Sequence, residues 1–211
     1  MLNFNDDSLE RISLEGAELH FTPRCDLGIP ADDLFAQLLH ETTWREEAIT
    51  IFGRTQPQPR LVAWYGDEGA SYEYSGIEHD PLPWTTTLTT LRDRMAKLTG
   101  GRYNSVLLNL YRNERDSMGM HADDEPELGP EPVIASLSLG EERSICFQHR
   151  HRRDLKNLNL PLPSGSLLVM RGSTQKHWKH GLRKLRRPCG PRINLTFRWI
   201  EADQTRRVHL S

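Results

Sequence analysis

The C-terminal half of the chain is a series of short segments in which apolar and polar residues alternate, and this pattern limits the possible folds most strongly. Alternation with a period of two predicts β-strands, and it occurs in residues 105–111, 134–140, 144–150, 165–170 and 192–199. The Pro- and Gly-rich residues 160–165 are expected to form a loop. A parallel sheet would need helical crossovers between such strands. We therefore expect antiparallel strands in a double-stranded β-helix, or jelly-roll, core.

Two helices are expected in the N-terminal half. Pro30 and the acidic residues after it begin an apolar face with helical spacing, which ends near Thr42. A second such face follows Pro83 and ends at Gly100. Residues 56–76, between the helices, are rich in Pro, Gly and Tyr and are expected to form loops and hairpins. Helices followed by strands indicate the α+β class.

The size and composition of the chain indicate a single soluble domain. It has 211 residues, 36% of them hydrophobic and 27% charged, and no run approaches the roughly 18 apolar residues of a membrane-spanning helix. The first residues are neither basic nor apolar, unlike a secretory signal. Three widely spaced cysteines, Cys25, Cys146 and Cys189, argue against a disulfide framework and a thiolate zinc site. We expect a cytoplasmic protein, or a nuclear one if the source is eukaryotic.

The net charge of −2 is the sum of two oppositely charged halves. Residues 1–100 carry 8 Lys and Arg against 17 Asp and Glu, a balance of −9, whereas residues 101–211 carry 19 against 12, a balance of +7. Residues 141–198 alone have 14 basic and 3 acidic side chains, or +11. Such an asymmetry favours a polyanionic partner, and a solvated surface is the simpler alternative.

A His-x-Asp pair lies in a turn-like segment after residues 105–111. Side chains at i and i+2 of an extended segment share a face, so His121 and Asp123 can point to one place. With a distant second histidine they would form the 2-His-1-carboxylate triad that binds non-haem Fe(II). The pair alone is weak evidence, because the pattern is frequent by chance and a surface histidine explains it more simply.

Four histidines are candidates for the remaining ligand. His177 and His180 lie just before the last strand, where a jelly roll can bring them opposite the His-x-Asp turn. We favour His180 of these two. His149 and His151 are better explained as a polar strand end that faces phosphate.

The last predicted strand has one polar face that carries two arginines. Alternation places four residues on that face: Arg192, Asn194, Thr196 and Arg198. Guanidinium groups bind carboxylates through two parallel hydrogen bonds, so this face could hold a small dicarboxylate at both ends, together with Asn109 and Tyr111. The alternative is an edge strand with a wet, basic face.

Together these motifs resemble the AlkB family of Fe(II)- and 2-oxoglutarate-dependent dioxygenases, and most of all its branch of duplex-DNA repair demethylases. The resemblance extends from about residue 45 to residue 200 and rests on segments that recur in the same order at similar intervals. They are residues 65–67, 72–76, 104–107, 109–111, 121–123, 134–136, 165–168, 177–180 and 191–198. It implies a jelly-roll core with N-terminal helices and a nucleotide-recognition lid.

The resemblance also implies the cofactors and their ligands. Iron would be bound by His121, Asp123 and His180, which would form the catalytic centre. Five residues would bind the cosubstrate 2-oxoglutarate, with Arg198 nearer the metal and Arg192 at the distal carboxylate: Asn109, Tyr111, Arg192, Asn194 and Arg198. With O2, such enzymes hydroxylate an N-methyl group of a base, so that formaldehyde, succinate and CO2 are released and the base is restored.

Residues that would bind the substrate follow from the same resemblance. Tyr72 and Tyr74 would hold a base that is flipped out of the helix, although simple packing is the alternative for them. Asp124 and Glu125 would contact the exocyclic group of the base, and their charge favours cationic lesions such as 1-methyladenine and 3-methylcytosine. Phe52 would enter the base stack, or it could be a core residue.

A basic loop next to the last strand resembles one that binds the DNA backbone in these relatives. It contains Arg183, Lys184, Arg186 and Arg187. Contacts of this kind with phosphates supply affinity and salt dependence but no choice of sequence.

We expect one domain with three parts. Residues 1–44 would form an N-terminal extension and a helix, 45–100 the recognition lid and its supporting helix, and 101–200 the dioxygenase core; residues 1–28 match nothing informative. The expected function is repair of N-alkylated bases in DNA by a monomer that does not bind membranes. An RNA or protein substrate for the same chemistry and a catalytically inactive nucleic-acid-binding module are the alternatives, and the basic segment favours nucleic acid over protein.

Overall fold

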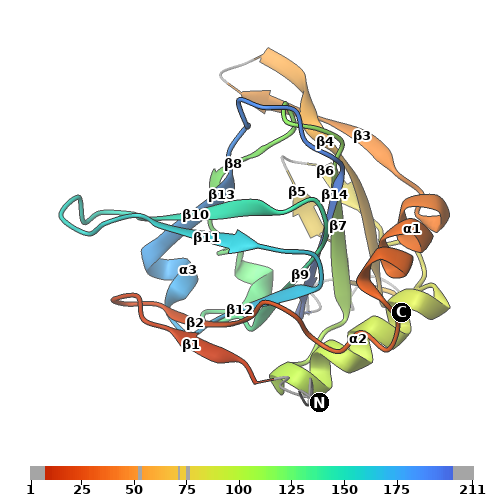
Figure 1. Cartoon of the computed structure of the whole chain (residues 1–211), viewed down its shortest axis with the longest axis horizontal. Coiled ribbons are helices and arrows are strands. Elements are labelled where there is room, and N and C mark those ends of the chain that lie inside the picture. Colours follow the sequence, from red (N-terminus) through yellow and green to blue (C-terminus); the bar gives the residue numbers. More distant parts are fainter. Residues whose placement is uncertain (1–7, 52–53, 71, 75–76, 202–211) are drawn as a thin grey trace, which may run out of the picture.

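The protein is a sandwich of two antiparallel sheets with two helices on one side (Figure 1). The computed structural model describes residues 8–51, 54–70, 72–74 and 77–201. Every pair of named strands is antiparallel, and the larger sheet has eight strands in the order β1 (Glu10–Ile12), β2 (Glu18–Thr22), β12 (Ser166–Arg171), β9 (Ile134–Gly140), β14 (Arg192–Arg198), β7 (Ser105–Tyr111), β4 (Arg54–Gly66) and β3 (Arg45–Ile51).

The smaller sheet supplies the other layer of the sandwich. Its four strands are β11 (Leu158–Leu162), β10 (Arg143–His149), β13 (Trp178–Leu182) and β8 (Met118–His121). The remaining elements are the hairpin of β5 (Tyr72–Tyr74) and β6 (Ile77–His79), the helices α1 (Ala31–Glu41), α2 (Thr86–Thr99) and α3 (Thr174–His177), and the 3₁₀ turn η1 (Pro126–Leu128). This arrangement confirms the expected α+β jelly roll.

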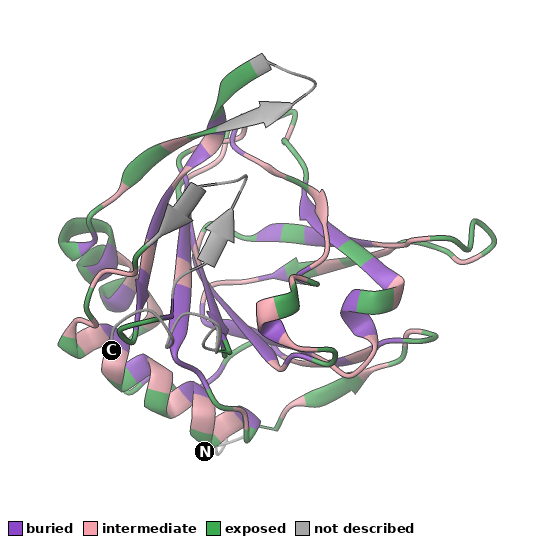
Figure 2. Cartoon of the chain, turned by 180° about the vertical axis from the view of Figure 1, so that it is seen from behind, coloured by how far each residue is buried: buried purple, intermediate pink, exposed green. Residues whose placement is uncertain are grey.

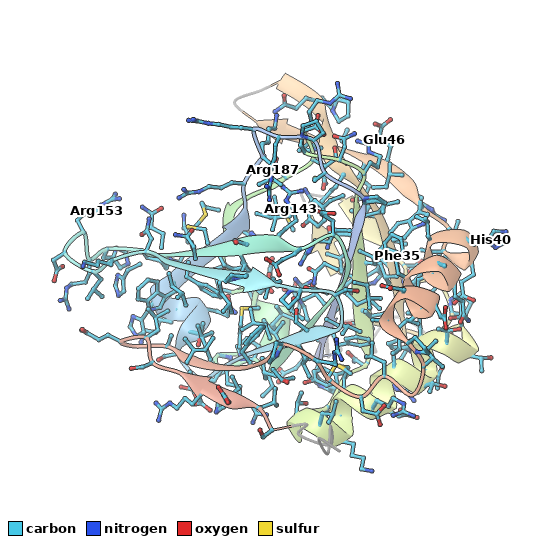
Figure 3. The ribbon with its side chains drawn as sticks, viewed as in Figure 1. Phe35, His40, Glu46, Arg143, Arg153 and Arg187 are labelled. Carbon is cyan, nitrogen blue, oxygen red and sulfur yellow. The ribbon has the colours of Figure 1, made fainter. Side chains whose placement is uncertain are left out.

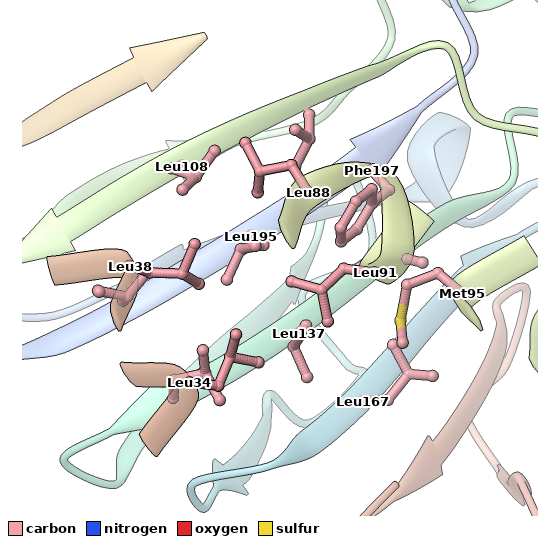
Figure 4. Close-up of a cluster of buried hydrophobic side chains, with 14 of the residues drawn as sticks. Leu34, Leu38, Leu88, Leu91, Met95, Leu108, Leu137, Leu167, Leu195 and Phe197 are labelled. Atoms are coloured by element: carbon pink, nitrogen blue, oxygen red, sulfur yellow. The ribbon is translucent and has the colours of Figure 1, made fainter. Parts of the chain in front are cut away.

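The outer face of the larger sheet is apolar because α1 and α2 cover it. Leu34 and Leu38 of α1 and Leu91 of α2 pack on Leu137 and Leu195 in the middle of the sheet (Figure 4). All five are at most 2% exposed. Figure 2 shows the same division, since the helices have a buried and an exposed side while the central strands are almost wholly buried. Burial of this apolar surface is the main stabilising contribution of the two helices.

The inner face is divided between a second apolar cluster and a polar region. In the cluster, Leu168 and Met170 of β12 pack with Phe147 of β10 and Trp178 of β13, so the two sheets are joined there by apolar contacts. On the neighbouring strand β14, the residues that face inward are polar instead. The apolar cluster therefore fixes the distance between the sheets, and the polar region beside it is free for chemistry.

The two helices confirm the sequence predictions. The helix α1 begins directly after Pro30, and the backbone N–H of Thr42 closes its last turn. The helix α2 has Thr85 as N-cap and ends at Gly100, whose φ of 67° is the left-handed conformation that favours glycine. Short-range signals were sufficient for these helices because caps and apolar spacing act within a few residues.

Loops and hairpins were expected over residues 56–76 and a loop over residues 160–165, but strands run through the prolines of both segments. β4 runs through Pro57 and Pro59, and β11 includes Pro161. Pro57 and Pro59 precede the point at which β4 begins to pair with β7, at Leu61, and β11 lies at the edge of its sheet. A proline has no backbone N–H to donate, so it is tolerated where a strand has no partner on one side.

The residues at the N-terminus extend the larger sheet. β2 pairs with β12, and β1 pairs with β2 at the edge. In the smaller sheet, the hairpin of β10 and β11 extends away from the body of the molecule on the side opposite α1 (Figure 1). Among the described residues, no helix is long and apolar enough to cross a membrane.

Candidate metal and cosubstrate site

Three potential metal ligands come together at the end of β8. His121 is the last residue of β8, Asp123 follows two residues later, and His180 lies opposite His121 in the β8–β13 pairing. The two imidazole rings are 4.4 Å apart between centroids, and one ligand atom of each of the three residues lies within 4.8 Å of the others. Two histidines and one carboxylate at a common point are the donor set of non-haem Fe(II) sites.

A glycine allows the strands that carry the histidines to approach closely. Gly181 follows His180, and the register of β13 against β8 shifts there. A Cβ atom on Gly181 would lie 2.9 Å from the carbonyl oxygen of Gly119 and 3.0 Å from that of Met118. No residue with a side chain fits such a contact without moving the backbone, so the relation of His180 to His121 depends on this glycine.

The carboxylate of Asp123 is buried and held by charge. Its Oδ1 atom forms an ion pair with Nη2 of Arg198 at 3.0 Å, and its backbone N–H donates to the side-chain oxygen of Gln175 at 3.0 Å. Burial acts to raise the pKa of the carboxyl, but Arg198 and the neighbouring histidines outweigh this and hold the pKa well below its usual range. Asp123 is therefore ionised, and its buried Oδ2 atom has no hydrogen-bond partner among the described residues.

Both histidines have a nitrogen lone pair available. Nδ1 of His121 lies 2.9 Å from the carbonyl oxygen of Gly119, which can only accept a hydrogen bond, so Nε2 carries the lone pair when the ring is neutral. Burial acts to lower the pKa of His121, but Oδ1 of Asp123, 3.5 Å from Nε2, outweighs this and raises it, so a cation at this point would take the place of the proton. Burial and the adjacent His121 lower the pKa of His180 to about 3, and its buried Nδ1 has no partner within the described part of the chain. A neutral imidazole beside an ionised carboxylate fits a divalent cation such as Fe(II).

A cavity, here called the β14 cavity, extends from the three ligands along the inner face of the larger sheet. The residues of β7, β9 and β14 that line it are Tyr111, Ser136, Arg192, Asn194, Thr196 and Arg198. The structure thus brings four of the five residues expected for 2-oxoglutarate into one cavity with the potential metal ligands. It also shows that β14 is a central strand, between β9 and β7, so the alternative of a wet edge strand is wrong.

Arg192 lies in this cavity and forms no ion pair with a carboxylate of the described residues. It is 2% exposed, donates from Nη2 to the hydroxyl of Ser138 at 2.8 Å, and lies 5.3 Å from the centre of the Tyr111 ring. Its Nε atom has no partner among the described residues, and burial lowers the pKa of the guanidinium to about 10. A buried cation that lacks a counter-ion fits a ligand that brings one, which is what the distal carboxylate of 2-oxoglutarate would do.

Asn109 was also expected to bind 2-oxoglutarate, but it is not among the residues that line the β14 cavity. Its side-chain oxygen accepts a hydrogen bond from Nε of Arg60 at 2.7 Å, and both side chains are buried. Asn109 pairs with Asn194 across the β7–β14 ladder and with Val62 across the β7–β4 ladder. It therefore stands between the β14 cavity and a second cavity that Arg60 lines.

The second cavity, here called the β4 cavity, lies on the other side of the potential metal ligands. His121, Asp123 and Arg198 line both cavities. The residues that belong to the β4 cavity alone include Glu47, Gln58, Arg60, Trp64 and Glu125. Sequence reasoning missed the four of these on β3 and β4, because the prolines hid the strand. The signal that could have found them is the two-residue spacing of Gln58, Arg60, Val62 and Trp64.

The structure supports the residues expected to bind the substrate to different degrees. Glu125 lines the β4 cavity, whereas the carboxylate of Asp124 pairs with Nη1 of Arg150 at 2.6 Å. Tyr72 and Tyr74 lie in β5, opposite His79 and Ile77, and their side chains are not described. Phe52 lies outside the described residues. The contact of Glu125 with the cavity is the one that the geometry supports.

The basic loop between β13 and β14 lies on the surface. Arg183, Lys184, Arg186 and Arg187 are exposed, and the backbone of the loop is held by Arg143, which donates to the carbonyl oxygen of Arg183 at 2.6 Å. A second basic segment forms the end of the β10–β11 hairpin, and Arg187 and Arg153 mark the two places in Figure 3. The basic residues of 141–198 thus lie mainly in these two surface segments, and among the others Arg143, Arg192 and Arg198 are buried.

A jelly roll that holds two histidines, a carboxylate and two inward arginines between its sheets defines an oxygenase of the Fe(II)- and 2-oxoglutarate-dependent class. Comparison with protein-family models agrees, since residues 30–198 match the 2OG-Fe(II) oxygenase superfamily. The chain belongs to this superfamily and, within it, to the family of AlkB homologues. The family uses Fe(II), 2-oxoglutarate and O2, which the donor set fits.

The curated relatives of the chain include a DNA oxidative demethylase and an alkB homolog dioxygenase. It is 41% identical over 179 residues to the mouse DNA oxidative demethylase ALKBH2, covering 81% of this chain and 75% of the relative. It is 40% identical over 181 residues to the human alpha-ketoglutarate-dependent dioxygenase alkB homolog 3, covering 82% of this chain but 63% of that relative's length. A solved structure of OsALKBH1 superposes with a TM-score of 0.63 at 16% identity, covering 91% of this chain and 100% of the other, and shows the shared fold.

Proposed function

We propose that this protein is a Fe(II)- and 2-oxoglutarate-dependent demethylase that repairs N-alkylated bases, 1-methyladenine and 3-methylcytosine, in DNA. The observation that carries the proposal is the position of His121 and Asp123, which line two separate cavities at once. A reaction that couples oxidation of a cosubstrate to oxidation of a substrate needs both molecules at one metal. The β14 cavity supplies a place for the first and the β4 cavity a place for the second.

In this proposal His121, Asp123 and His180 hold the iron, and Arg192 binds the distal carboxylate of 2-oxoglutarate. Tyr111 and Asn194 line the path between them, and the amide of Asn194 is fixed by the hydroxyl of Ser136 at 2.8 Å. When bound, Fe(II), 2-oxoglutarate and O2 together supply the oxidising power that hydroxylates a C–H bond. The hydroxylated N-methyl group then breaks down to formaldehyde and the restored base.

The protein's own residues position the reactants and set the charge. Arg198 holds Asp123 ionised and in place through the 3.0 Å ion pair. Gln175 fixes the backbone of Asp123 from the other side. Glu125 adds a carboxylate to the β4 cavity, where it favours a cationic methylated base over the neutral normal base.

The relatives and the surface charge support nucleic acid as the substrate. A methylated base inside a duplex cannot reach the cavity, so the base must be flipped out or taken from a single strand. The exposed arginines and lysine of residues 183–187 are suited to bind the phosphate backbone, and activity should then fall as salt rises. We assign the wedge role to Phe52 and the base-holding role to Tyr72 and Tyr74 as parts of the same proposal, with residues 45–100 as the recognition lid.

One assay tests the proposal. Purified protein with Fe(II), ascorbate and 2-oxoglutarate is incubated with oligonucleotides that carry 1-methyladenine or 3-methylcytosine, as single-stranded DNA, duplex DNA and RNA. We expect formaldehyde and the restored base from DNA, in proportion to succinate. Turnover of RNA alone would move the substrate class to RNA, and no turnover of any of them would contradict repair. An inactive binding module would still bind the oligonucleotides in the presence of a chelator without releasing formaldehyde.

A further inference from the structure

Gln58 lies in the wall of the β4 cavity, and its side-chain amide is buried there without a hydrogen-bond partner among the described residues. The residue is 1% exposed, and both Oε1 and Nε2 lack a partner in this part of the chain. A buried amide that lacks partners costs free energy, and native proteins rarely retain one without a reason. Here the unused groups are one donor and one acceptor on the same rigid plane.

The backbone around Gln58 fixes the place of this amide. Pro57 and Pro59 flank it, so φ is set on both sides and the conformation of Gln58 itself is restricted to the extended region. The pairing of β3 with β4 is irregular between Glu46 and Ala48, opposite this segment, and such bulges commonly redirect a side chain near a site. The backbone that carries the amide is therefore preorganised.

The neighbours of Gln58 show what it faces. The β4 cavity is also lined by Arg60, which Asn109 holds at 2.7 Å, and by His121 and Asp123 of the candidate metal centre. The amide thus borders the same cavity that would receive a methylated base, on the β4 side. A ligand that fills this cavity meets a donor and an acceptor side by side.

We propose that Gln58 is a specificity-determining residue that reads the adenine edge of the substrate, an inference that rests on the proposed demethylase function. Glutamine pairs with adenine through two hydrogen bonds, to N7 and from the N6 amino group. In 1-methyladenine the methyl group occupies N1, so N6 and N7 stay available. In 3-methylcytosine the group next to the amino group, on the side away from the methylated N3, is a C–H. It cannot accept a hydrogen bond, so a single hydrogen bond to the amide is possible. Gln58 thus favours 1-methyladenine over 3-methylcytosine.

The test compares three bases in one single-stranded DNA sequence: 1-methyladenine, 7-deaza-1-methyladenine and 3-methylcytosine. Single strands keep the cost of unpairing out of the comparison. We expect wild-type kcat/KM for 1-methyladenine to exceed that for its 7-deaza analogue by about tenfold, as a paired glutamine contact predicts. In Gln58→Leu, kcat/KM for 1-methyladenine should fall by about tenfold, and the values for the other two bases should change much less.

The control variant is Gln56→Leu, on the same strand two residues earlier, where the side chain is exposed. It should leave the ratios of all three bases unchanged. Gln58→Leu should not lower the melting temperature, because it removes two buried groups that lack partners. An equal loss for all three bases, or a wild-type enzyme that does not distinguish 1-methyladenine from the 7-deaza analogue, would overturn the role of Gln58 and leave the demethylase function standing. A wild-type protein that turns over no methylated base would overturn both.

Discussion

The β14 cavity and the β4 cavity both reach His121 and Asp123, whereas His180 lines the β14 cavity alone, and the two cavities are built differently. The central strands β7, β9 and β14 supply most polar groups of the β14 cavity, and some of these groups are bound to one another, as Arg192 is to Ser138. The β4 cavity lies toward the edge of the sheet, where β4 has lost its β7 neighbour at Pro57 and Pro59, and it contains an amide without a partner. Central strands thus hold the groups that any reaction of this class needs, and the edge holds groups that select a substrate.

The largest effect should come from Asp123, which lines both cavities. Asp123→Ala removes a carboxylate ligand and leaves the buried Arg198 without its counter-ion, so formaldehyde release should fall to the level of the blank. Binding of Fe(II) should weaken as well, as measured by titration under anaerobic conditions. Asp154→Ala serves as the control, because Asp154 pairs with Arg152 on the exposed hairpin. Retained turnover in Asp123→Ala would refute the proposed metal centre.

The second effect separates the β14 cavity from the β4 cavity. Arg192→Met should raise the KM for 2-oxoglutarate by about 30-fold or more, since a buried charge pair is lost, and should change the KM for the oligonucleotide little. Because the guanidinium has no counter-ion in the absence of a ligand, the melting temperature of the variant should not fall. An unchanged KM for 2-oxoglutarate would place the cosubstrate elsewhere.

A third variant tests whether Asn109 contributes to the β14 cavity or to the β4 cavity, and its expected effect is smaller. The family resemblance gives it to 2-oxoglutarate, whereas the structure ties it to Arg60 in the β4 cavity. We expect Asn109→Ala to raise the KM for the methylated oligonucleotide by about fivefold, the loss of one hydrogen bond to a charged group, and to leave the KM for 2-oxoglutarate within about twofold. The opposite pattern would restore the cosubstrate role and weaken the distinction between the two cavities.

The smallest effect concerns the segment that joins β7 to β8 and belongs to neither cavity. Asp116 accepts three hydrogen bonds from Arg112, at 2.8 to 3.0 Å. Burial acts to raise the pKa of Asp116, but these bonds outweigh it and the pKa is lowered. A lowered pKa stabilises the fold above the unfolded value of about 4, and this contribution is lost as the pH falls through the folded value.

Asp116→Asn should therefore lower the free energy of unfolding at pH 7 by about 1.5 to 3 kcal/mol, with less difference from wild type below about pH 4. Urea unfolding at several pH values measures this. The KM for 2-oxoglutarate and the KM for the oligonucleotide should both be unchanged at a temperature where the variant is fully folded. A change in either would show that the segment also positions His121.

Much of this architecture could be predicted from the sequence because its signals are local. Alternation predicted that Arg192 and Arg198 share an inward face, and helical spacing predicted α1 and α2. The grouping of His121 with His180 depends on the β8–β13 pairing between residues 59 positions apart, and the choice among four histidines rested on topology and on family resemblance. Residues whose role is set by long-range contacts gave no such signal.

Gln175 and the pair of Arg60 and Asn109 are of this kind. Gln175 reaches Asp123 because α3 packs against β12 and β13, and nothing in its neighbours in sequence indicates that contact. Arg60 and Asn109 meet across the β4–β7 pairing, and the prolines before Arg60 concealed the strand. Proline is a reliable sign of a missing N–H but not of a loop, because a strand end at an edge tolerates it.

Gly181 has a consequence for the geometry of this site. It offers no group to a metal or a substrate, yet even a methyl group in its place would collide with the carbonyl oxygens of Gly119 and Met118. An alanine there would require β13 and β8 to move apart at this point, which would change the position of His180 relative to His121 although every residue that does chemistry would still be present. The geometry of the three ligands thus depends on a residue that itself binds nothing.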